Sequence, residues 1–192
     1  MEHFAARGFE ATRIEEIAAE AGVSKGAVFG YFNTKAGLFL AAYQAAARSF
    51  QPYLAAPPEV VAAGFFAVLE YWLLATPHLI QEDWIPYRVT LLGNYAIDLE
   101  LKREINRYLR TQDPYGTVEF VRYGIERGEV RTDMDFEMTT SMVDWLMEKF
   151  QDALVTQELD PGLFVRAGER TSSAQARIDQ FVKLLRRAIG RR

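Results

Sequence analysis

The residues best suited to bind another molecule lie within the first 35 positions of the chain. Lys25 starts a short predicted helix, where a long cationic side chain can reach the edges of base pairs in the major groove of DNA. The Thr12 hydroxyl, Tyr31 and Lys35 can donate hydrogen bonds to phosphates, as can the backbone amides at two predicted helix N-termini. These side chains indicate contact with a nucleic acid rather than covalent chemistry.

The same segment predicts two short helices joined by a tight turn. Thr12 followed by Glu15 forms a capping box, so Thr12 is expected to cap the first of them. Gly22 supplies the turn, because glycine tolerates the left-handed conformation, and Ser24 is expected to cap the second helix. Five apolar residues at helical spacing form the shared core of the pair: Ile14, Ile17, Ala21, Val23 and Val28. This pattern favours a helix-turn-helix whose second helix enters the major groove, although a purely structural helical hairpin shares much of the spacing.

Residues 1–45 resemble the DNA-binding signature of TetR-type (TetR/AcrR) transcriptional regulators. The resemblance is carried by the runs 4–14, 17–18, 21–29 and 31–32, by Lys35 and by 38–39. It implies two sets of DNA contacts: Ser24, Lys25, Gly26 and Ala27 at or beside the bases, and Thr12, Arg13, Phe29, Tyr31 and Lys35 along the phosphates. For Lys25 and Lys35 the alternative is a solvated surface charge, and for Phe29 it is a packing role.

The segment departs from the family pattern in three respects: at Phe29, at Gly30, where the family often has a larger residue, and at the start of the chain. Phe29 stands where the family often has a tyrosine, so a hydroxyl contact to phosphate is absent there. The chain begins inside the first helix of the pattern, and we expect the natural protein to be longer at this end. Residues 1–40 carry four lysines and arginines against five glutamates. Because affinity for DNA depends on neutralising phosphates, this start predicts DNA binding below full strength.

Composition excludes several classes of protein. Of the 192 residues, 49% are hydrophobic and 25% are charged, as in an ordinary globular protein, and the net charge is −4. The absence of cysteine excludes a disulfide scaffold, and two histidines leave little capacity for a metal site. No signal peptide and no membrane-spanning stretch is visible, so a cytoplasmic location is expected. We find no catalytic motif and expect no enzyme activity, no catalytic residue, no metal and no cofactor.

Helical spacing recurs along the whole chain, and no convincing strand pattern is present, so we expect an all-α fold. Thr34 is expected to cap a helix over 35–50, and a further helix is expected over 58–75. Asp113 and Pro114 are expected to restart a helix. The last two helices are expected over 136–157 and 174–189. These elements predict a DNA-binding domain over residues 1–45, with a truncated first helix, and a ligand-binding and dimerisation domain over residues 46–192.

Aromatic and methionine side chains gather in the second domain, and they suit a cavity for a flat or apolar ligand. The candidate pocket residues are Phe65, Phe66, Tyr71, Trp72, Trp84, Tyr87, Tyr95, Met142 and Trp145. The alternative is that each of these side chains simply fills the core. The resemblance implies a ligand-binding domain here, with a pocket that differs between family members.

Two apolar stripes mark the last two helices, each wider than the docking of a terminal helix requires. The candidate dimer contacts are Met138, Met142, Leu146, Phe150, Leu154, Ile178, Phe181, Val182, Leu185 and Ile189. Two such helices from each of two chains form a four-helix bundle, which is the usual dimer interface of the family. The alternative is a monomer that uses both stripes internally.

Together these patterns predict a ligand-responsive, DNA-binding transcriptional regulator. We expect a homodimeric repressor whose partners are double-stranded operator DNA and a small, largely apolar or aromatic effector, with no membrane partner. The alternative is a helical protein-interaction module that kept the fold but lost DNA binding, which the acidic N-terminal segment favours.

Overall fold

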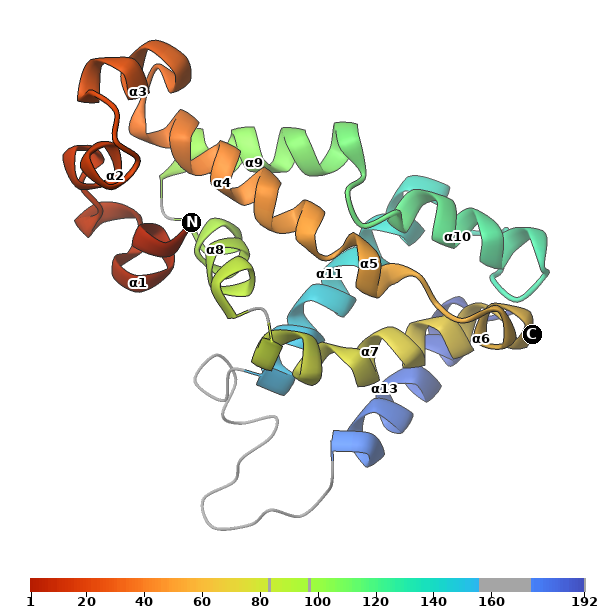
Figure 1. The fold of residues 1–192 in the computed structure, drawn as a ribbon. Helices are drawn as coiled ribbons and strands as arrows, with labels where there is room; N and C mark the ends of the chain where they lie inside the picture. Colours follow the sequence, from red (N-terminus) through yellow and green to blue (C-terminus); the bar gives the residue numbers. More distant parts are fainter. Residues whose placement is uncertain (83, 97, 156–173, 192) are drawn as a thin grey trace. The chain divides into compact units, whose positions relative to one another are not determined.

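A computed structural model of the chain describes residues 1–82, 84–96, 98–155 and 174–191, apart from the side chains of residues 77–81, 155 and 174. Within these ranges the protein is all-α, as predicted, and an isolated bridge between Val130 and Gly190 is the one β-type pairing described (Figure 1). The helices are α1 (Glu2–Ala11), α2 (Ile14–Glu20), α3 (Lys25–Phe32), α4 (Lys35–Ser49), α5 (Gln51–Leu54), α6 (Pro58–Ala63), α7 (Phe65–Glu82), α8 (Trp84–Asn94), α9 (Leu99–Gln112), α10 (Thr117–Glu126), α11 (Phe136–Val155) and α13 (Ala174–Ile189).

The chain divides into two compact units. Unit 1 comprises Met1–Pro52 and Asp83–Tyr115, and unit 2 comprises Tyr53–Glu82 and Gly116–Arg192. The predicted division after residue 45 falls inside α4, which continues as one helix to Ser49. Helices α8 and α9 belong to the same unit as the N-terminal helices, so the compact units do not follow the predicted domains.

Unit 1 is built around α4, which packs against α3, α8 and α9 (Figure 1). Phe39 and Tyr43 of α4 are fully buried one turn apart, and Phe4 of α1 meets Phe39 edge to face at 5.0 Å. A Cβ at Gly93 would lie 2.5 Å from the Tyr43 ring, so the absence of a side chain there allows α8 to approach α4 closely. The Tyr43 hydroxyl then donates to Asn94 Oδ1 at 2.8 Å, which satisfies its polar end.

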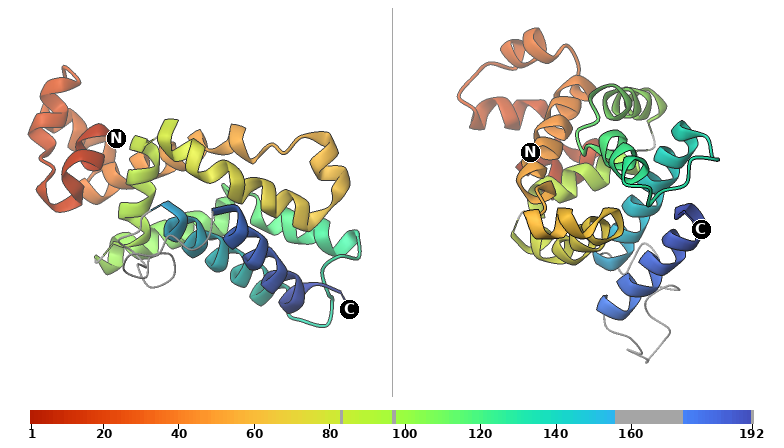
Figure 2. Two further views of the ribbon diagram at one scale, coloured as in Figure 1. Left: turned by 90° about the horizontal axis from the view of Figure 1, so that it is seen from below. Right: turned by 90° about the vertical axis from the view of Figure 1, so that its right-hand side faces the viewer.

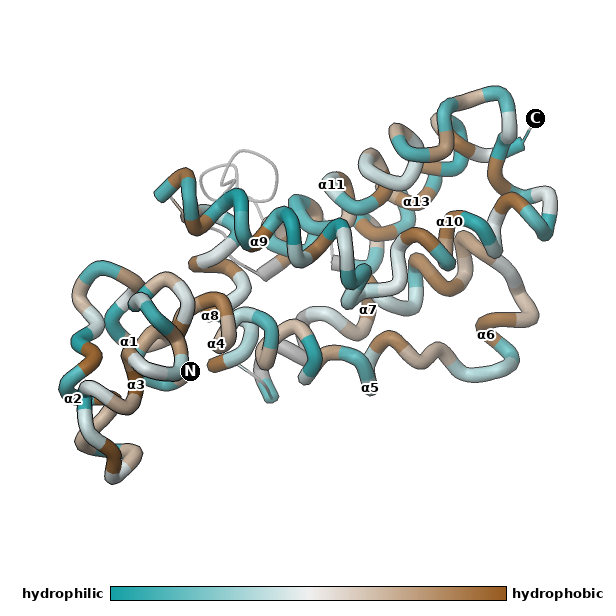
Figure 3. Tube along the Cα trace, turned by 90° about the horizontal axis from the view of Figure 1, so that it is seen from above, coloured by the Kyte–Doolittle hydropathy of each residue, from teal (hydrophilic) through white to brown (hydrophobic). Residues whose placement is uncertain are grey.

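Unit 1 also contains the amphipathic helix α9. Its trace alternates between hydrophobic and hydrophilic residues in Figure 3. Leu101 and Ile105, four residues apart, are buried in the core of the unit, while Arg103 and Arg107 lie at the surface. The side chain of Asp98 caps this helix by accepting from the Leu101 amide at 2.7 Å.

Unit 2 is built around α7, whose Phe65, Leu69 and Leu73 are fully buried at a spacing of four residues. Helices α10, α11 and α13 pack against it, and Figure 2 shows α13 lying along α7. Phe150 of α11 and Phe181 of α13 stack with their ring centroids 4.0 Å apart. Burying these apolar faces removes them from water and holds the unit together.

Two predicted helices differ from the structure. The helix expected over 58–75 is two helices, because Gly64 has φ +111° and ends α6 before α7 begins. The second of these, α7, continues through Pro77 to Glu82. Asp113 does not restart a helix: it ends α9 in the left-handed conformation at φ +40°, and α10 begins only at Thr117, after Gly116.

Candidate nucleic-acid interface

Helix α3 is anchored to the protein by a narrow strip of its surface. Val28 is its one buried residue, and it forms a small core with Ile14 and Ala18 of α2. Phe32, half-buried, packs against the same core, while residues 25–27 and 29–31 are exposed. A helix with so little of its surface covered has most of its circumference available to a partner.

Local capping fixes where α3 and α4 begin. The Ser24 hydroxyl accepts from the Ala27 amide at 3.0 Å, and the Thr34 hydroxyl accepts from the Gly37 amide at 3.0 Å. Gly22, at φ +67°, makes the turn between α2 and α3. The turn and both caps are confirmed as predicted, because each depends only on residues close in the sequence.

Lys25 lies at the first position of α3 and forms an ion pair with Glu15 of α2. Its Nζ also lies 5.6 Å from the centroid of the Phe29 ring, one turn along α3. The hydrogen bond from Lys25 holds the pKa of the Glu15 carboxyl below its ordinary value, because the neighbouring ammonium favours the carboxylate. The lysine at the expected DNA-facing position is therefore held by a carboxylate of its own protein.

The remaining predicted contacts surround α3. Tyr31 is 81% exposed and meets Phe32 edge to face at 4.8 Å. Gly26, Ala27 and Arg13 are also exposed, and Arg13 is the residue that precedes α2. Lys35 is half-buried: its Nζ donates to the Glu10 carbonyl at 2.9 Å and lies 4.9 Å from the Phe9 ring centroid. Phe29 is 37% exposed, and its ring is held beneath the Lys25 ammonium.

Thr12 is placed differently from the prediction. The residue that precedes α2 is Arg13, whose side chain makes no capping bond, so the predicted capping box is wrong. The Thr12 side chain is buried, and its hydroxyl lies 2.7 Å from the Gly8 carbonyl and 3.0 Å from the His3 carbonyl. The physical reason is the break in α1 at Gly8, where φ is +76° and the helix ladder is interrupted. This hydroxyl serves the α1–α2 connection and is turned away from any phosphate.

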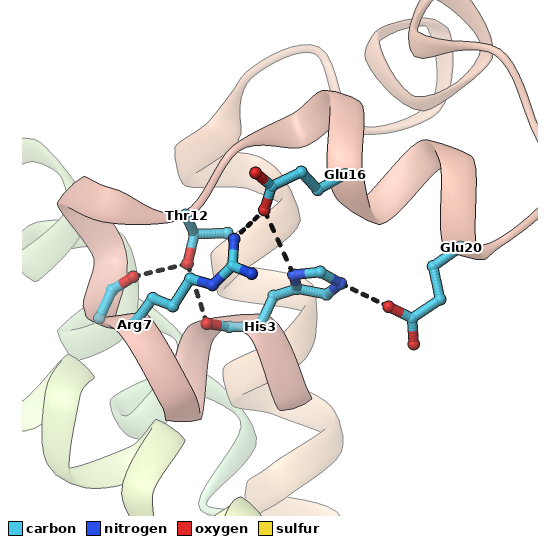
Figure 4. A network of polar contacts seen from close by, with 6 residues as sticks. His3, Arg7, Thr12, Glu16 and Glu20 are labelled. Atoms are coloured by element: carbon cyan, nitrogen blue, oxygen red, sulfur yellow. Dashed lines mark hydrogen bonds and ion pairs between the residues drawn. The ribbon is translucent and has the colours of Figure 1, made fainter.

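A polar network that the sequence did not reveal joins α1 to α2 (Figure 4). His3 Nε2 lies 2.6 Å from Glu20 Oε2, and His3 Nδ1 lies 4.0 Å from Glu16 Oε2. Arg7 forms an ion pair with the same oxygen of Glu16. These contacts occupy two of the three carboxylates of α2, and Lys25 occupies the third. No sequence signal marks them, since they depend on the angle between two helices.

The predicted pocket residues are divided between the units. Trp84, Tyr87 and Tyr95 belong to unit 1, and Trp84 and Tyr95 are exposed there. The other six belong to unit 2: Phe65, Phe66, Tyr71, Trp72, Met142 and Trp145. Trp145 is 58% exposed. A hollow of about 480 Å³ in unit 2 is lined by none of them; its lining is Ile125, Gly128, Val130, Arg131, Thr132, Asp133 and Arg191.

Within unit 2 the inner aromatics are in mutual contact. Phe65 and Phe66 are fully buried, and Phe65 stacks on Phe120 with centroids 4.2 Å apart. Trp72 lies 4.4 Å from the same Phe120 ring, and its Nε1 donates to the Leu54 carbonyl at 3.0 Å. Tyr71, Trp72 and Met142 are half-buried. Phe65 and Phe66 thus occupy core positions, whereas the half-buried residues border the surface.

The predicted dimer contacts likewise separate into inner and outer residues. Five of them are buried in the core of their own unit: Phe150, Ile178, Val182, Leu185 and Ile189. Met142, Leu154 and Phe181 are partly buried against that core, while Met138 and Leu146 are exposed. The prediction that all ten face a second chain is corrected for the five buried residues, because helix α7 covers that stripe. Trp145 of α11 and Leu184 of α13 are also exposed, at 58% and 62%.

Within the described part of the chain, no cluster of three or more histidine, aspartate or glutamate side chains is arranged to hold a metal ion. The helices described there also include none with the length and apolarity that crossing a bilayer requires. In the N-terminal helices the candidate site is the exposed α3, with its capped N-terminus and Lys25.

Helices α2 and α3, joined by the turn at Gly22, form a helix-turn-helix whose second helix is exposed. Residues 1–42 match the family model described as "Bacterial regulatory proteins, tetR family". Over these residues the chain is therefore similar to the DNA-binding segment of TetR-family regulators.

Similarity to known proteins extends over most of the chain. The HTH-type transcriptional repressor AcnR of Corynebacterium glutamicum is 26% identical over 161 residues, which cover 83% of this chain and 80% of that protein. The transcriptional regulator FadR of Bacillus subtilis, solved in complex with stearoyl-CoA, is 20% identical with a TM-score of 0.67, covering 96% of this chain and 92% of that one. The fatty acid degradation regulator FadR of Bacillus halodurans is 18% identical with a TM-score of 0.64, covering 96% and 92%. The two structures share the all-α fold.

Proposed function

We propose that the chain is a ligand-responsive repressor that binds operator DNA through α3 and releases it when a small, largely apolar or aromatic molecule binds. The observation that carries the DNA-binding part is the exposure of α3 on every side except the Val28 strip. An α-helix of this kind fits the width of the major groove of B-DNA. The name of the AcnR relatives, transcriptional repressor, supports repression as the direction of control.

We assign Lys25, Gly26 and Ala27 to the base edges, with Ser24 fixing the start of the helix. Glycine and alanine leave the helix surface bare, so the backbone can come close to the base pairs. Tyr31 and Arg13, both exposed, are assigned to the phosphates. Lys35 and Phe29 are assigned to the margin of the interface, because both already have partners within the protein.

Two recognition helices are needed to bind a palindromic operator, so we propose a homodimer. The exposed apolar side chains of the last two helices are its contact surface: Met138, Trp145, Leu146 and Leu184. Three of them lie on α11 at helical spacing, and large apolar side chains exposed along one helix favour an interface with another protein surface. On this basis the functional division into a DNA-binding segment, residues 1–45, and a ligand-binding and dimerisation segment, residues 46–192, is kept as part of the proposal.

The effector is proposed to bind in unit 2, where Tyr71, Trp72 and Met142 are half-buried and the last two pack against the core. A ligand can reach these three side chains without displacing the fully buried Phe65 and Phe66. The FadR structure with stearoyl-CoA shows that a protein of this fold can hold a long apolar chain with a polar head. The protein has a form that binds DNA and a form that does not. The ligand releases DNA only if its affinity for the second form is higher than its affinity for the first.

Selection of DNA from a random pool tests the DNA-binding part. We expect enrichment of a palindrome with half-sites about one helical turn apart. Lys25→Ala is expected to relax base discrimination by about 1–3 kcal/mol at one position in each half-site. Equal losses on operator and random DNA would assign Lys25 to a phosphate instead. Enrichment of no sequence, with capture of a protein partner, would favour the interaction module.

Ligand-induced thermal stabilisation tests the effector class. The panel consists of stearoyl-CoA, stearate, a planar aromatic dye and coenzyme A alone. We expect stabilisation by an apolar member of the panel, release of the selected operator by the same compound, and a weaker response in Trp72→Ala. If free coenzyme A stabilised the protein as much as stearoyl-CoA does, an apolar effector would be contradicted, because free coenzyme A lacks the acyl chain.

A further inference from the structure

The N-terminal helices have an electrostatic balance that is unusual for a DNA-binding surface. Residues 1–40 contain four lysines and arginines and five glutamates, and three of the glutamates lie on the short helix α2. Glu16 and Glu20 contact Arg7 and His3 of α1. Glu15 alone among the three contacts α3, where the expected DNA-facing side chain begins.

The Glu15–Lys25 pair is positioned so that DNA can compete for it. Glu15 is the second residue of α2 and Lys25 the first of α3, so the pair bridges the two helices of the motif. The side chains are 58% and 52% exposed, which leaves both charged groups accessible to a large partner. Lys25 also lies above the Phe29 ring, so its ammonium is held along the protein surface from two sides.

We infer that Glu15 is a specificity-determining residue, which competes with DNA for Lys25 and so suppresses binding to non-operator sequences. This inference rests on the proposed function. A random duplex seldom places a suitable base at the position that Lys25 reaches, so at most registers it offers phosphate oxygens in place of the carboxylate, and Glu15 itself repels those phosphates. A guanine offers two acceptors, O6 and N7, in the major groove. Lys25 therefore leaves Glu15 at little loss only where the operator presents such a base.

The Glu15 carboxylate is charged near neutral pH. The pKa of Glu15 is lowered chiefly by its hydrogen bond from Lys25. Because this pKa is lowered, the ion pair is complete at any pH above the ordinary pKa of a glutamate. It is lost when the pH falls through the lowered pKa and Glu15 becomes protonated. Competition between Glu15 and DNA therefore operates unchanged near neutral pH.

The test compares Glu15→Gln with Glu20→Gln, since both substitutions remove one negative charge from α2. The affinity of each variant for the selected operator and for a random duplex is measured between about 50 and about 200 mM salt. We expect Glu15→Gln to raise the affinity for random DNA about threefold to tenfold and that for the operator less, so that the specificity ratio falls. The salt slope for random DNA should steepen by about one unit. Glu20→Gln is expected to change both affinities equally and slightly.

Equal effects of the two substitutions would overturn the inference, because net charge alone would then explain them. A fall in random-DNA affinity in Glu15→Gln would overturn it as well, since Glu15 would then be positioning Lys25 for binding. Failure of the wild-type chain to prefer any sequence is a different result, and it counts against the proposed function. Carboxyl NMR titration without DNA tests the pair directly: the Glu15 pKa should rise in Lys25→Ala, and an unchanged pKa would show that the pair does not form in solution.

Discussion

At the level of single residues, Thr12 shows that a hydroxyl suited to binding phosphate can instead form hydrogen bonds within the protein. The Thr12 hydroxyl lies within hydrogen-bonding distance of the Gly8 and His3 carbonyls and is buried. The sequence places Thr12 correctly beside the start of α2, yet it does not show which way the hydroxyl turns. That direction is set by the break in α1 at Gly8, which leaves a carbonyl in need of a donor.

Replacing Thr12 by valine removes the hydroxyl but keeps the shape of the side chain. We expect Thr12→Val to lower the free energy of unfolding by about 1–2 kcal/mol, because part-buried carbonyl oxygens lose their donor. Thr12→Ser, which keeps the hydroxyl, should be closer to wild type. Urea denaturation measures both variants. A Thr12→Val protein with wild-type stability and weakened DNA binding would return this hydroxyl to the phosphates.

The local geometry of the candidate DNA interface could be predicted from the sequence, but its internal contacts could not. Ser24 and Lys25 stand in a local pattern of turn, cap and short helix, and such patterns depend on neighbours in the sequence. The ion pair of Lys25 with Glu15 joins two helices across ten residues, and the His3 contacts join α1 to α2. Side chains that meet between helices depend on the crossing angle, which no spacing pattern specifies.

At the level of elements, the boundary between α6 and α7 shows how a distant residue can define a helix. Gly64 adopts φ +111° and ψ −176°, a conformation that side-chain-bearing residues rarely adopt. The Glu129 carboxylate then accepts from the Phe65 amide at 3.1 Å and from Arg127 Nε at 2.7 Å. A carboxylate at a helix N-terminus satisfies a free amide and interacts favourably with the helix dipole. The apolar run across 58–75 by itself predicts one helix. The break is missed because the residue that caps α7, Glu129, lies 64 residues from Phe65 in the sequence.

The close approach of Gly64 to Glu129 makes alanine costly at this position. A Cβ at residue 64 would lie 2.2 Å from Glu129 Oε1, in addition to the backbone strain. We expect Gly64→Ala to lower the free energy of unfolding by about 2–4 kcal/mol. Gly30→Ala is the matched control, since a Cβ there meets nothing within 4 Å, and it should raise stability by about 1 kcal/mol through helix propensity. In a Glu129→Ala background the cost of Gly64→Ala should shrink; an undiminished cost would attribute the whole effect to the backbone.

At the level of the whole molecule, the apolar stripes of the last two helices do not reveal whether the same chain or a second chain covers them. Their apolar stripes predict burial, but a stripe is equally buried by a helix of the same chain or of a second chain. Ile178, Val182 and Leu185 are covered by their own unit, whereas Trp145 and Leu184 remain exposed. The all-α class and the positions of α11 and α13 were predictable because helical periodicity is local. The partner of each face was not, because it depends on how distant helices assemble.

The exposed tryptophan provides the sharpest test of the proposed dimer. A large aromatic side chain that becomes buried at an interface commonly contributes more than about 2 kcal/mol to association. We therefore expect Trp145→Glu to weaken dimerisation at least about 30-fold, as measured by sedimentation equilibrium, while its circular dichroism and thermal transition at high concentration show a folded protein.

Leu99→Glu is the matched control for that substitution. Leu99 is 70% exposed at the start of α9, in unit 1. Leu99→Glu therefore introduces the same negative charge at an exposed apolar position outside the proposed contact surface. It should leave the association constant unchanged. The monomeric Trp145→Glu protein should also lose affinity for a full palindrome while its weak affinity for a single half-site persists, because each half-site contacts one α3. If Trp145→Glu remains a dimer of wild-type affinity, the contact surface must lie on other residues, and the assignment of α11 and α13 to dimerisation would be wrong.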